Sequence, residues 1–255
     1  MARILKKIPD FKLPKYKMKE VGDLEELRME YAEKNIEDMK KRMERHHAQE
    51  NYPGTHYRTV KEFFLRSTEL YKERPFILQT FNKKEGFREI SYGQFRRDVN
   101  DFGTALTCVL NLEGEKVMIL SETTYEWYVS YMALLCGAGI AVPTDKELPD
   151  NELENLMRRS GARAIIFSSK KKDAVKKAAA HCPNMKYCIE MRADYKEEGQ
   201  FIGFDFLREE GKVFTDLGDT SLMDKEIDPD AFAVLIFTSG TTSAAKGVMI
   251  CNRNL

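Results

Sequence analysis

The central part of the chain alternates between short apolar runs and segments with helical spacing, and this alternation is the strongest constraint on its fold. The expected strands cover 116–120, 140–143, 164–167 and 186–191. The expected helices between them cover 127–138, 150–160 and 170–181. Strands that alternate with helices pair in parallel, because each helix carries the chain back across the sheet. The pattern therefore predicts an α/β fold with a mostly parallel sheet layered with helices.

Further elements are expected on both sides of this region. They are a helix over 59–70, strands over 76–81 and 87–92 around a turn at 82–86, a long helix over 95–110, and strands over 231–237 and 248–251. The segment 200–230 is the least periodic, and only a short helix around 205–210 is expected there.

Local signals refine the helix that follows the first central strand. Residues 123–126, Thr-Thr-Tyr-Glu, have the pattern of a capping box. The aromatic residues of 127–131 are expected to belong to the core rather than to a ligand site. Gly137 and Gly139 lack the third glycine of a dinucleotide fingerprint, so they predict a tight turn from helix to strand.

The first 57 residues differ from the rest and predict a charged helical extension, followed by a domain over 58–255. Residues 1–19 carry seven Lys or Arg against a single acid, and 21–49 show only a narrow apolar stripe on a charged helix. The favoured interpretation of this segment is a solvated helix. Weak contact of residues 1–19 with an anionic membrane surface, or of the helix with a partner helix, stays open.

Composition limits the compartment and the partners. Lys plus Arg and Asp plus Glu both number 41, so overall charge gives no reason to expect a nucleic-acid partner. The five cysteines form no C-x-x-C pair, and the chain shows no secretory signal. These features predict reduced thiols and a cytoplasmic protein.

The stretch FTSGTTSAAKGVM, residues 237–249, has the composition of a phosphate-binding loop. Glycines let backbone N–H groups approach a phosphate, hydroxyls add donors, and a lysine neutralises the charge. The apolar run 231–237 places the loop at the end of a buried strand, where open α/β sheets bind their ligands. The loop is not a Walker A loop, because Lys246 precedes Gly247 and an expected strand instead of a helix. A surface turn rich in Gly and Thr is the alternative.

This stretch resembles the phosphate loop of the adenylate-forming superfamily, whose pattern is close to Tyr/Phe-Thr-Ser-Gly-Ser/Thr-Thr-Gly-x-Pro-Lys-Gly-Val. Two positions depart from it, Ser243 at the usual Gly and Ala245 at the usual Pro. The segments REISYGQFRRDVNDFGTAL and KVMILSETTYEWYVSYMALLCGAGIAVPTDKELPDNELENLMRRSGARAIIFSS are similar to the same enzymes in order and spacing, so the resemblance covers about 59–255. VPTDKELPDNEL and the proline-free loop look nearest to the long-chain fatty acyl-CoA synthetases.

The resemblance implies a reaction and a set of site residues. A carboxylic acid and ATP give an acyl-adenylate and pyrophosphate, and a thiol, usually coenzyme A, then takes the acyl group. The phosphate-binding residues would be Thr238, Ser239, Gly240, Thr241, Thr242, Ser243, Lys246 and Gly247. Thr241 or Thr242 would reach Mg²⁺.

The family's later motifs for adenine, ribose and the acyl group, and its C-terminal lid with a catalytic lysine, are missing from this sequence. We therefore expect the N-terminal part of an AMP-forming acyl-CoA ligase, inactive alone and without a catalytic residue of its own. A noncatalytic nucleotide-binding α/β module is the alternative. A third hypothesis is an interaction protein that uses its basic, helical N-terminus.

Overall fold

The computed structural model describes residues 56–80, 87–238 and 246–255. Tyr57–Leu255 forms one of the two compact units into which the chain divides, and the architecture below is that of this unit. The expected extension over 1–57, its proposed membrane contact through 1–19 and the turn at 82–86 lie outside the described residues, apart from 56 and 57.

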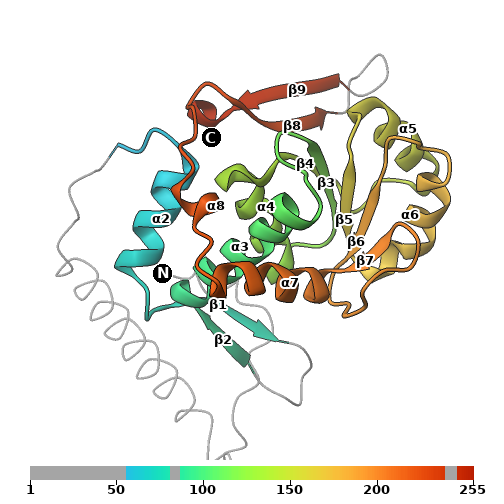
Figure 1. Cartoon of the computed structure of the whole chain (residues 1–255). Helices are drawn as coiled ribbons and strands as arrows, with labels where there is room; N and C mark the ends of the chain where they lie inside the picture. Colours follow the sequence, from blue (N-terminus) through green and yellow to red (C-terminus); the bar gives the residue numbers. More distant parts are fainter. Residues whose placement is uncertain (1–55, 81–86, 239–245) are drawn as a thin grey trace, which may run out of the picture. The chain divides into compact units, whose positions relative to one another are not determined.

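A seven-stranded sheet occupies the centre of the unit, in the order β7-β6-β5-β3-β4-β8-β9 (Figure 1). The strands are β3 (Lys116–Leu120), β4 (Ile140–Thr144), β5 (Ala164–Phe167), β6 (Tyr187–Glu190), β7 (Phe201–Gly203), β8 (Phe232–Thr238) and β9 (Lys246–Cys251). Every neighbouring pair is parallel except β8 and β9, which are antiparallel. The mostly parallel sheet predicted from the alternation is thus confirmed, with one antiparallel strand at its edge.

The two faces of the sheet bury alternate residues in two separate cores. On β3, Val117 and Ile119 belong to one core, and Met118 and Leu120 to the other. Successive side chains of a strand point to opposite faces, so a continuous apolar run is what a sheet covered on both sides requires. This explains why the central strands read as unbroken apolar stretches in the sequence.

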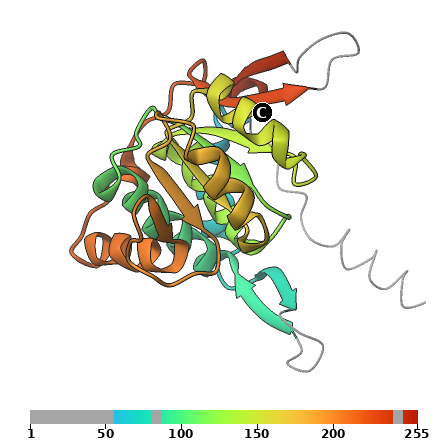
Figure 2. The same cartoon turned by 90° about the vertical axis from the view of Figure 1, so that its right-hand side faces the viewer.

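Helices cover both faces, which makes the unit three-layered. The first core includes residues of α2 (Val60–Leu70), α3 (Tyr92–Thr104), α4 (Tyr125–Ala133), α7 (Phe204–Asp216) and α8 (Ser221–Asp224). The second core includes residues of α5 (Asp150–Ser160) and α6 (Lys172–Ala179). Figure 2 shows α5 and α6 in front of the sheet, on the face opposite α3 and α7. Short η segments complete the set: η2 (Ala105–Val109), η3 (Leu134–Ala138), η4 (Ser169–Lys171) and η5 (Asn252–Asn254).

A separate antiparallel ribbon, β1 (Pro75–Thr80) and β2 (Phe87–Ser91), precedes α3. Phe76 of β1 stacks on Phe95 of α3, with ring centroids 4.1 Å apart. Phe95 also meets Phe64 of α2 edge to face at 5.5 Å. Aromatic packing of this kind joins the ribbon and α2 to the first core.

Two predicted helix boundaries are confirmed, the start of α2 at Thr59 and the end of α5 at Gly161, whereas α3 begins at Tyr92, earlier than the expected 95. Thr59 caps α2 by accepting from the N–H of Glu62, and Ser91 caps α3 by accepting from the N–H of Gln94. Helix α5 ends at Gly161, whose φ of 63° is the left-handed conformation that glycine adopts without strain.

One local prediction around α4 is corrected, and another is confirmed in part. The N-cap is Thr124, which accepts from the N–H of Trp127, so the capping box that begins at Thr123 does not form. Its expected partner, Glu126, instead bonds Arg192, with 3.2 Å between Oε1 and Nε. As expected, Trp127 and Tyr131 pack against the first core, although they are only partly buried. Tyr128 is exposed, whereas Val129 and Ala133 of the same helix are fully buried.

The prediction for 200–230 was wrong in extent. The structure has a strand, β7, then the 13-residue helix α7, and then α8. The buried residues of α7 are only Phe204, Leu207 and Gly211, which is too few for an apolar stripe. Much of its contact with α3 is polar, and hydrophobic periodicity does not register polar contacts.

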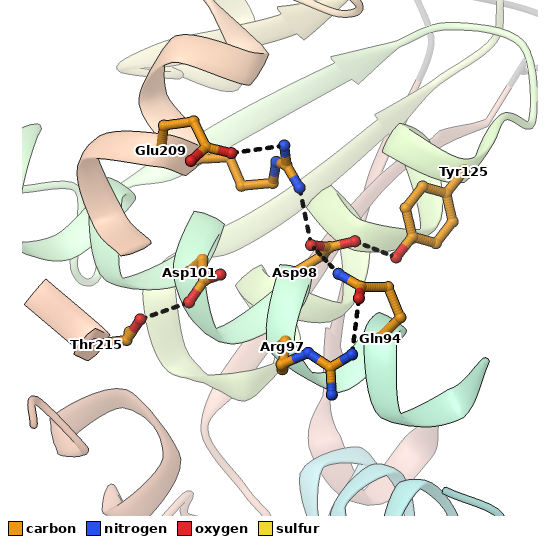
Figure 3. A network of polar contacts seen from close by, with 8 residues as sticks. Gln94, Arg97, Asp98, Asp101, Tyr125, Glu209 and Thr215 are labelled. Atoms are coloured by element: carbon orange, nitrogen blue, oxygen red, sulfur yellow. Dashed lines mark hydrogen bonds and ion pairs between the residues drawn. The ribbon is translucent and has the colours of Figure 1, made fainter. Parts of the chain in front are cut away.

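This polar contact centres on Asp98 of α3 (Figure 3). Asp98 is buried and accepts from Arg208 of α7 at 2.9 Å and from the hydroxyl of Tyr125 at 2.6 Å. Burial, and next the Asp98 carboxylate, raise the pKa of Tyr125 far above its ordinary value, so this hydroxyl stays a donor. One turn further along α3, Asp101 accepts from Thr215 at 2.6 Å. The network joins α3, α4 and α7, and Phe204 of α7 also stacks on Phe102 of α3 with ring centroids 4.1 Å apart.

The closest approach of α3 and α7 requires a glycine, and this generates a stability prediction. A Cβ added to Gly211 would lie 1.8 Å from the carbonyl oxygen of Asp101 and 2.8 Å from the backbone nitrogen of Ala105. Because both contacts are with backbone, we expect Gly211→Ala to force the helices apart and lower the free energy of unfolding by about 1–3 kcal/mol. Urea unfolding measures this. Glu210→Ala, at an exposed neighbour on α7, is the control, and wild-type stability for Gly211→Ala would contradict the close packing.

Candidate phosphate-binding site

The candidate site lies at the turn between β8 and β9. Strand β8 runs parallel to β4 in the sheet, and β9 returns antiparallel along its outer side. The turn therefore follows the carboxyl end of a strand that is parallel to its inner neighbour. This edge of the sheet is where open α/β folds bind ligands.

The structure places three of the eight predicted site residues, all at the mouth of this turn. Thr238 is the last residue of β8 and pairs directly with Lys246, the first residue of β9. Gly247 pairs with Phe237, and all three predicted residues are exposed. The other five, Ser239, Gly240, Thr241, Thr242 and Ser243, lie outside the described residues, as does the expected Mg²⁺ contact.

The part of the hairpin next to the turn packs against the second core. Leu235 is buried and Phe237 is half-buried against that core. A Cβ on Gly247 would lie 3.2 Å from Cδ1 of Leu235, so glycine lets β9 lie close over the side chains of β8. The guanidinium of Arg159, on α5, lies 5.6 Å from the ring centroid of Phe237. This positive charge next to the turn could not be predicted, since nothing in the sequence connects α5 with β8.

Paired charges lie beyond the carboxyl ends of the other strands. Glu122, after β3, bonds Lys170 at 2.7 Å, and this contact lowers the pKa of Glu122 to about 2. Glu190, at the end of β6, is buried and accepts from Lys172 at 2.7 Å and from Tyr195 at 2.8 Å. Burial alone would raise the pKa of Glu190, but these two hydrogen bonds outweigh it and hold that pKa below its usual value. These pairs could not be predicted from the sequence, because the partners come from different elements.

Residues 56–80, 87–238 and 246–255 contain no group of three His, Cys, Asp or Glu side chains that could hold a metal ion. Over the same ranges, no helix has the length and apolar character that a membrane span requires.

Comparison with known proteins decides the family. The family described as AMP-binding enzyme matches residues 64–255. The chain belongs to this family. The resemblance seen in the phosphate loop and in the segments before it is therefore confirmed, and the family is that of the adenylate-forming ligases.

Relatives of this AMP-binding protein include two from Arabidopsis thaliana. A 4-coumarate–CoA ligase-like protein is 26% identical over 197 residues, which are 77% of this chain and 33% of the relative. A chloroplastic long-chain-fatty-acid–acyl-carrier-protein ligase is 22% identical over 221 residues, 79% of this chain and 29% of the relative. The AMP-binding chain thus spans about a third of the length of these relatives.

Solved structures show the same fold. An anthranilate CoA ligase in complex with anthranoyl-AMP superposes with a TM-score of 0.62 at 20% identity, over 79% of this chain and 36% of that one. A putative long-chain-fatty-acid CoA ligase of Rhodopseudomonas palustris gives 0.61 at 16% identity, over 76% and 44%. The layered α/β architecture is therefore that of adenylate-forming enzymes.

The charge pairs at the sheet edge lead to a prediction of pH dependence. Glu190→Gln removes the charge that Lys172 and Tyr195 contact, and we expect a loss of about 1–2 kcal/mol in the free energy of unfolding at pH 7, because Lys172 is partly exposed. The pKa of Glu190 is lowered in the folded state, so its contribution is complete above the unfolded value of 4.5 and disappears as the pH falls through the lower folded value.

Chemical unfolding of both proteins at several pH values checks this. The difference between wild type and Glu190→Gln should shrink below pH 4.5. Asp216→Asn, which breaks the exposed pair with Lys212, is the control and should cost little at any pH. A difference for Glu190→Gln that is independent of pH would contradict the ionised pair.

Proposed function

We propose that this chain is the ATP-phosphate-binding part of an AMP-forming ligase that activates a carboxylic acid. The observation that carries the proposal is the pairing of Thr238 with Lys246 at the mouth of the β8–β9 turn. This pairing brings a hydroxyl and an ammonium group to one place, at the ligand-binding edge of the sheet. Membership of the AMP-binding family supplies the reaction class.

The roles of the residues follow from the charge that develops in the reaction. A carboxylate oxygen of the acid attacks the α-phosphorus of ATP, the bond from that phosphorus to the bridging oxygen of the β-phosphate breaks, and pyrophosphate leaves. The loop hydroxyls and N–H groups bind the β and γ phosphates, and Lys246 offsets the negative charge that grows on pyrophosphate. Interactions that strengthen toward the transition state accelerate the step. Mg²⁺, bound with ATP through Thr241 or Thr242, would screen the same phosphates.

The acyl acceptor and the acid are finer parts of the proposal. The relatives' names mention coenzyme A or an acyl carrier protein as acceptor, and coumarate, anthranilate or long-chain fatty acid as acid. We propose coenzyme A as the thiol and a fatty acid as the substrate. The family resemblance of 142–153 and of the proline-free loop supports this choice.

Lys246→Ala tests the phosphate assignment. Loss of one charged hydrogen bond costs about 1.5–3 kcal/mol, so we expect pyrophosphate and ATP·Mg²⁺ to bind this chain roughly 10- to 150-fold more weakly. Thr241→Val should cost less, because it removes a neutral donor. Isothermal titration measures both. Lys212→Ala, at an exposed lysine on α7, is the matched control and should bind as wild type does.

The same variant separates the two half-reactions. In a protein that carries this chain together with the segments its relatives have beyond the matched third, Lys246→Ala should slow adenylate formation by a similar factor. Transfer of a supplied acyl-adenylate to coenzyme A should hardly change, because pyrophosphate has already left. Equal losses in both half-reactions, or unchanged pyrophosphate binding, would show that the loop does not hold pyrophosphate.

A further inference from the structure

A cavity with a positive lining lies between α2 and α3. It has a volume of about 430 Å³ and is lined by Thr68, Glu69, Lys72, Gly93, Arg96 and Arg97. Its helices lie on the face of the sheet opposite α5 and α6. The turn end of the β8–β9 hairpin points away from α2 (Figure 1). The cavity is therefore a different place from the candidate ATP site.

The charges around this cavity are unbalanced. Three cations and one carboxylate line it, which leaves a net charge of +2. Several lysines and arginines elsewhere in the unit have acidic partners, such as Lys172 with Glu190 at 2.7 Å. Within the described ranges, neither Lys72 nor Arg96 forms an ion pair. The excess positive charge of the lining is unfavourable, and an anion in the cavity would relieve this repulsion.

Local contacts position the stem of Lys72 and the guanidinium of Arg97. The carbonyl of Lys72 accepts from the N–H of Gly93 at 2.9 Å. A Cβ on Gly93 would lie 2.9 Å from Cγ of Lys72, so glycine lets the lysine stem lie across the start of α3. Gln94 accepts from Nη2 of Arg97 at 2.7 Å and donates to the buried Asp98 at 2.9 Å (Figure 3). A guanidinium that is already oriented loses less freedom on binding.

The N–H groups of the first turn of α3 are already used inside the protein. Tyr92 donates to the carbonyl of Arg74, Gly93 to that of Lys72, and Gln94 to the hydroxyl of Ser91. Recognition in this cavity therefore depends on side chains. Two guanidinium groups and one ammonium group favour an oxyanion that can accept several hydrogen bonds at once.

We propose that the cavity binds a phosphate monoester, at a site separate from the one that holds ATP. A monoester carries a charge of about −1.5 to −2 at pH 7, which matches the net charge of the lining. The volume lies within the range of small-molecule sites, about 300–1,000 Å³. Arg96 and Lys72 supply the unpaired charge, and Arg97 supplies an oriented guanidinium. The monoester is a small phosphorylated metabolite or the headgroup of a phosphorylated lipid, and the two share this chemistry.

Titration calorimetry of the full 255-residue chain with phenyl phosphate tests the proposal. We expect millimolar or tighter binding by wild type and at least about tenfold weaker binding by Lys72→Gln/Arg96→Gln, since two charged contacts are lost. Phenyl sulfate, a monoanion of similar shape, should bind much more weakly. Lys212→Gln is the matched control for a lysine outside the cavity. Thermal unfolding of each variant confirms that it is folded.

Two further measurements identify the kind of monoester that binds and the site at which it binds. Vesicles of phosphatidylcholine with phosphatidylinositol 4-phosphate replace phenyl phosphate as the probe. Binding to these vesicles alone, lost in the double variant, supports the proposal with a lipid headgroup as the monoester. Lys246→Ala should leave phenyl phosphate binding unchanged. The proposal for the cavity and the proposal for the ATP phosphates can therefore be tested independently, and either can be wrong while the other is correct.

Three results would overturn the proposal. One is no binding of either probe by wild type. Another is equal binding by wild type and Lys72→Gln/Arg96→Gln. The third is loss of binding in Lys246→Ala, which would place the probe in the β8–β9 turn.

Discussion

The parallel pairing of β3, β4 and β8 is the constraint on which the rest of the structure depends. Parallel strands need crossover connections, and these connections put helices on both faces of the sheet and bury every central strand twice. The same pairing brings the carboxyl ends of the strands to one edge. The β8–β9 turn, Glu122 and Glu190 all lie at strand ends because of it. The topology of the sheet therefore determines where the candidate site lies, whichever side chains the turn carries.

The helical layer over the first core is held together by two kinds of contact. Apolar packing dominates under α3 and the η2 segment that continues it, where Phe102 and Leu106 are fully buried. Between α3 and α7 the contact combines the stacked rings of Phe102 and Phe204 with a close approach at Gly211 and with the carboxylates of Asp98 and Asp101. A buried carboxylate is costly unless it is hydrogen-bonded, so Arg208, Tyr125 and Thr215 are required partners. The same network orients Arg97 at the proposed phosphate cavity.

The difference between these contacts explains how far the sequence could predict the fold and the site. Unbroken apolar runs identified β3 and β5 with their observed bounds, and Gly161 marked the end of α5. Helix α7 was underestimated because Phe204 and Leu207 are its only buried side chains with apolar character, and much of its remaining contact with α3 is polar or depends on Gly211. The candidate phosphate loop could be proposed from its own residues, since hydroxyls, glycines and Lys246 are adjacent in the chain. Arg159 and the cavity between α2 and α3 could not, because they depend on contacts between elements.

The most direct test of the central claim is hydrogen–deuterium exchange across the β8–β9 turn of this chain. If residues 238–247 bind the phosphates of ATP, saturating ATP·Mg²⁺ should slow exchange in peptides that cover the turn, because their N–H groups become hydrogen-bonded to phosphate oxygens. Adenosine, which has the same base and ribose but no phosphate, should leave the exchange of these peptides unchanged. Unchanged exchange with ATP·Mg²⁺, or equal protection by adenosine, would contradict a phosphate site at this turn.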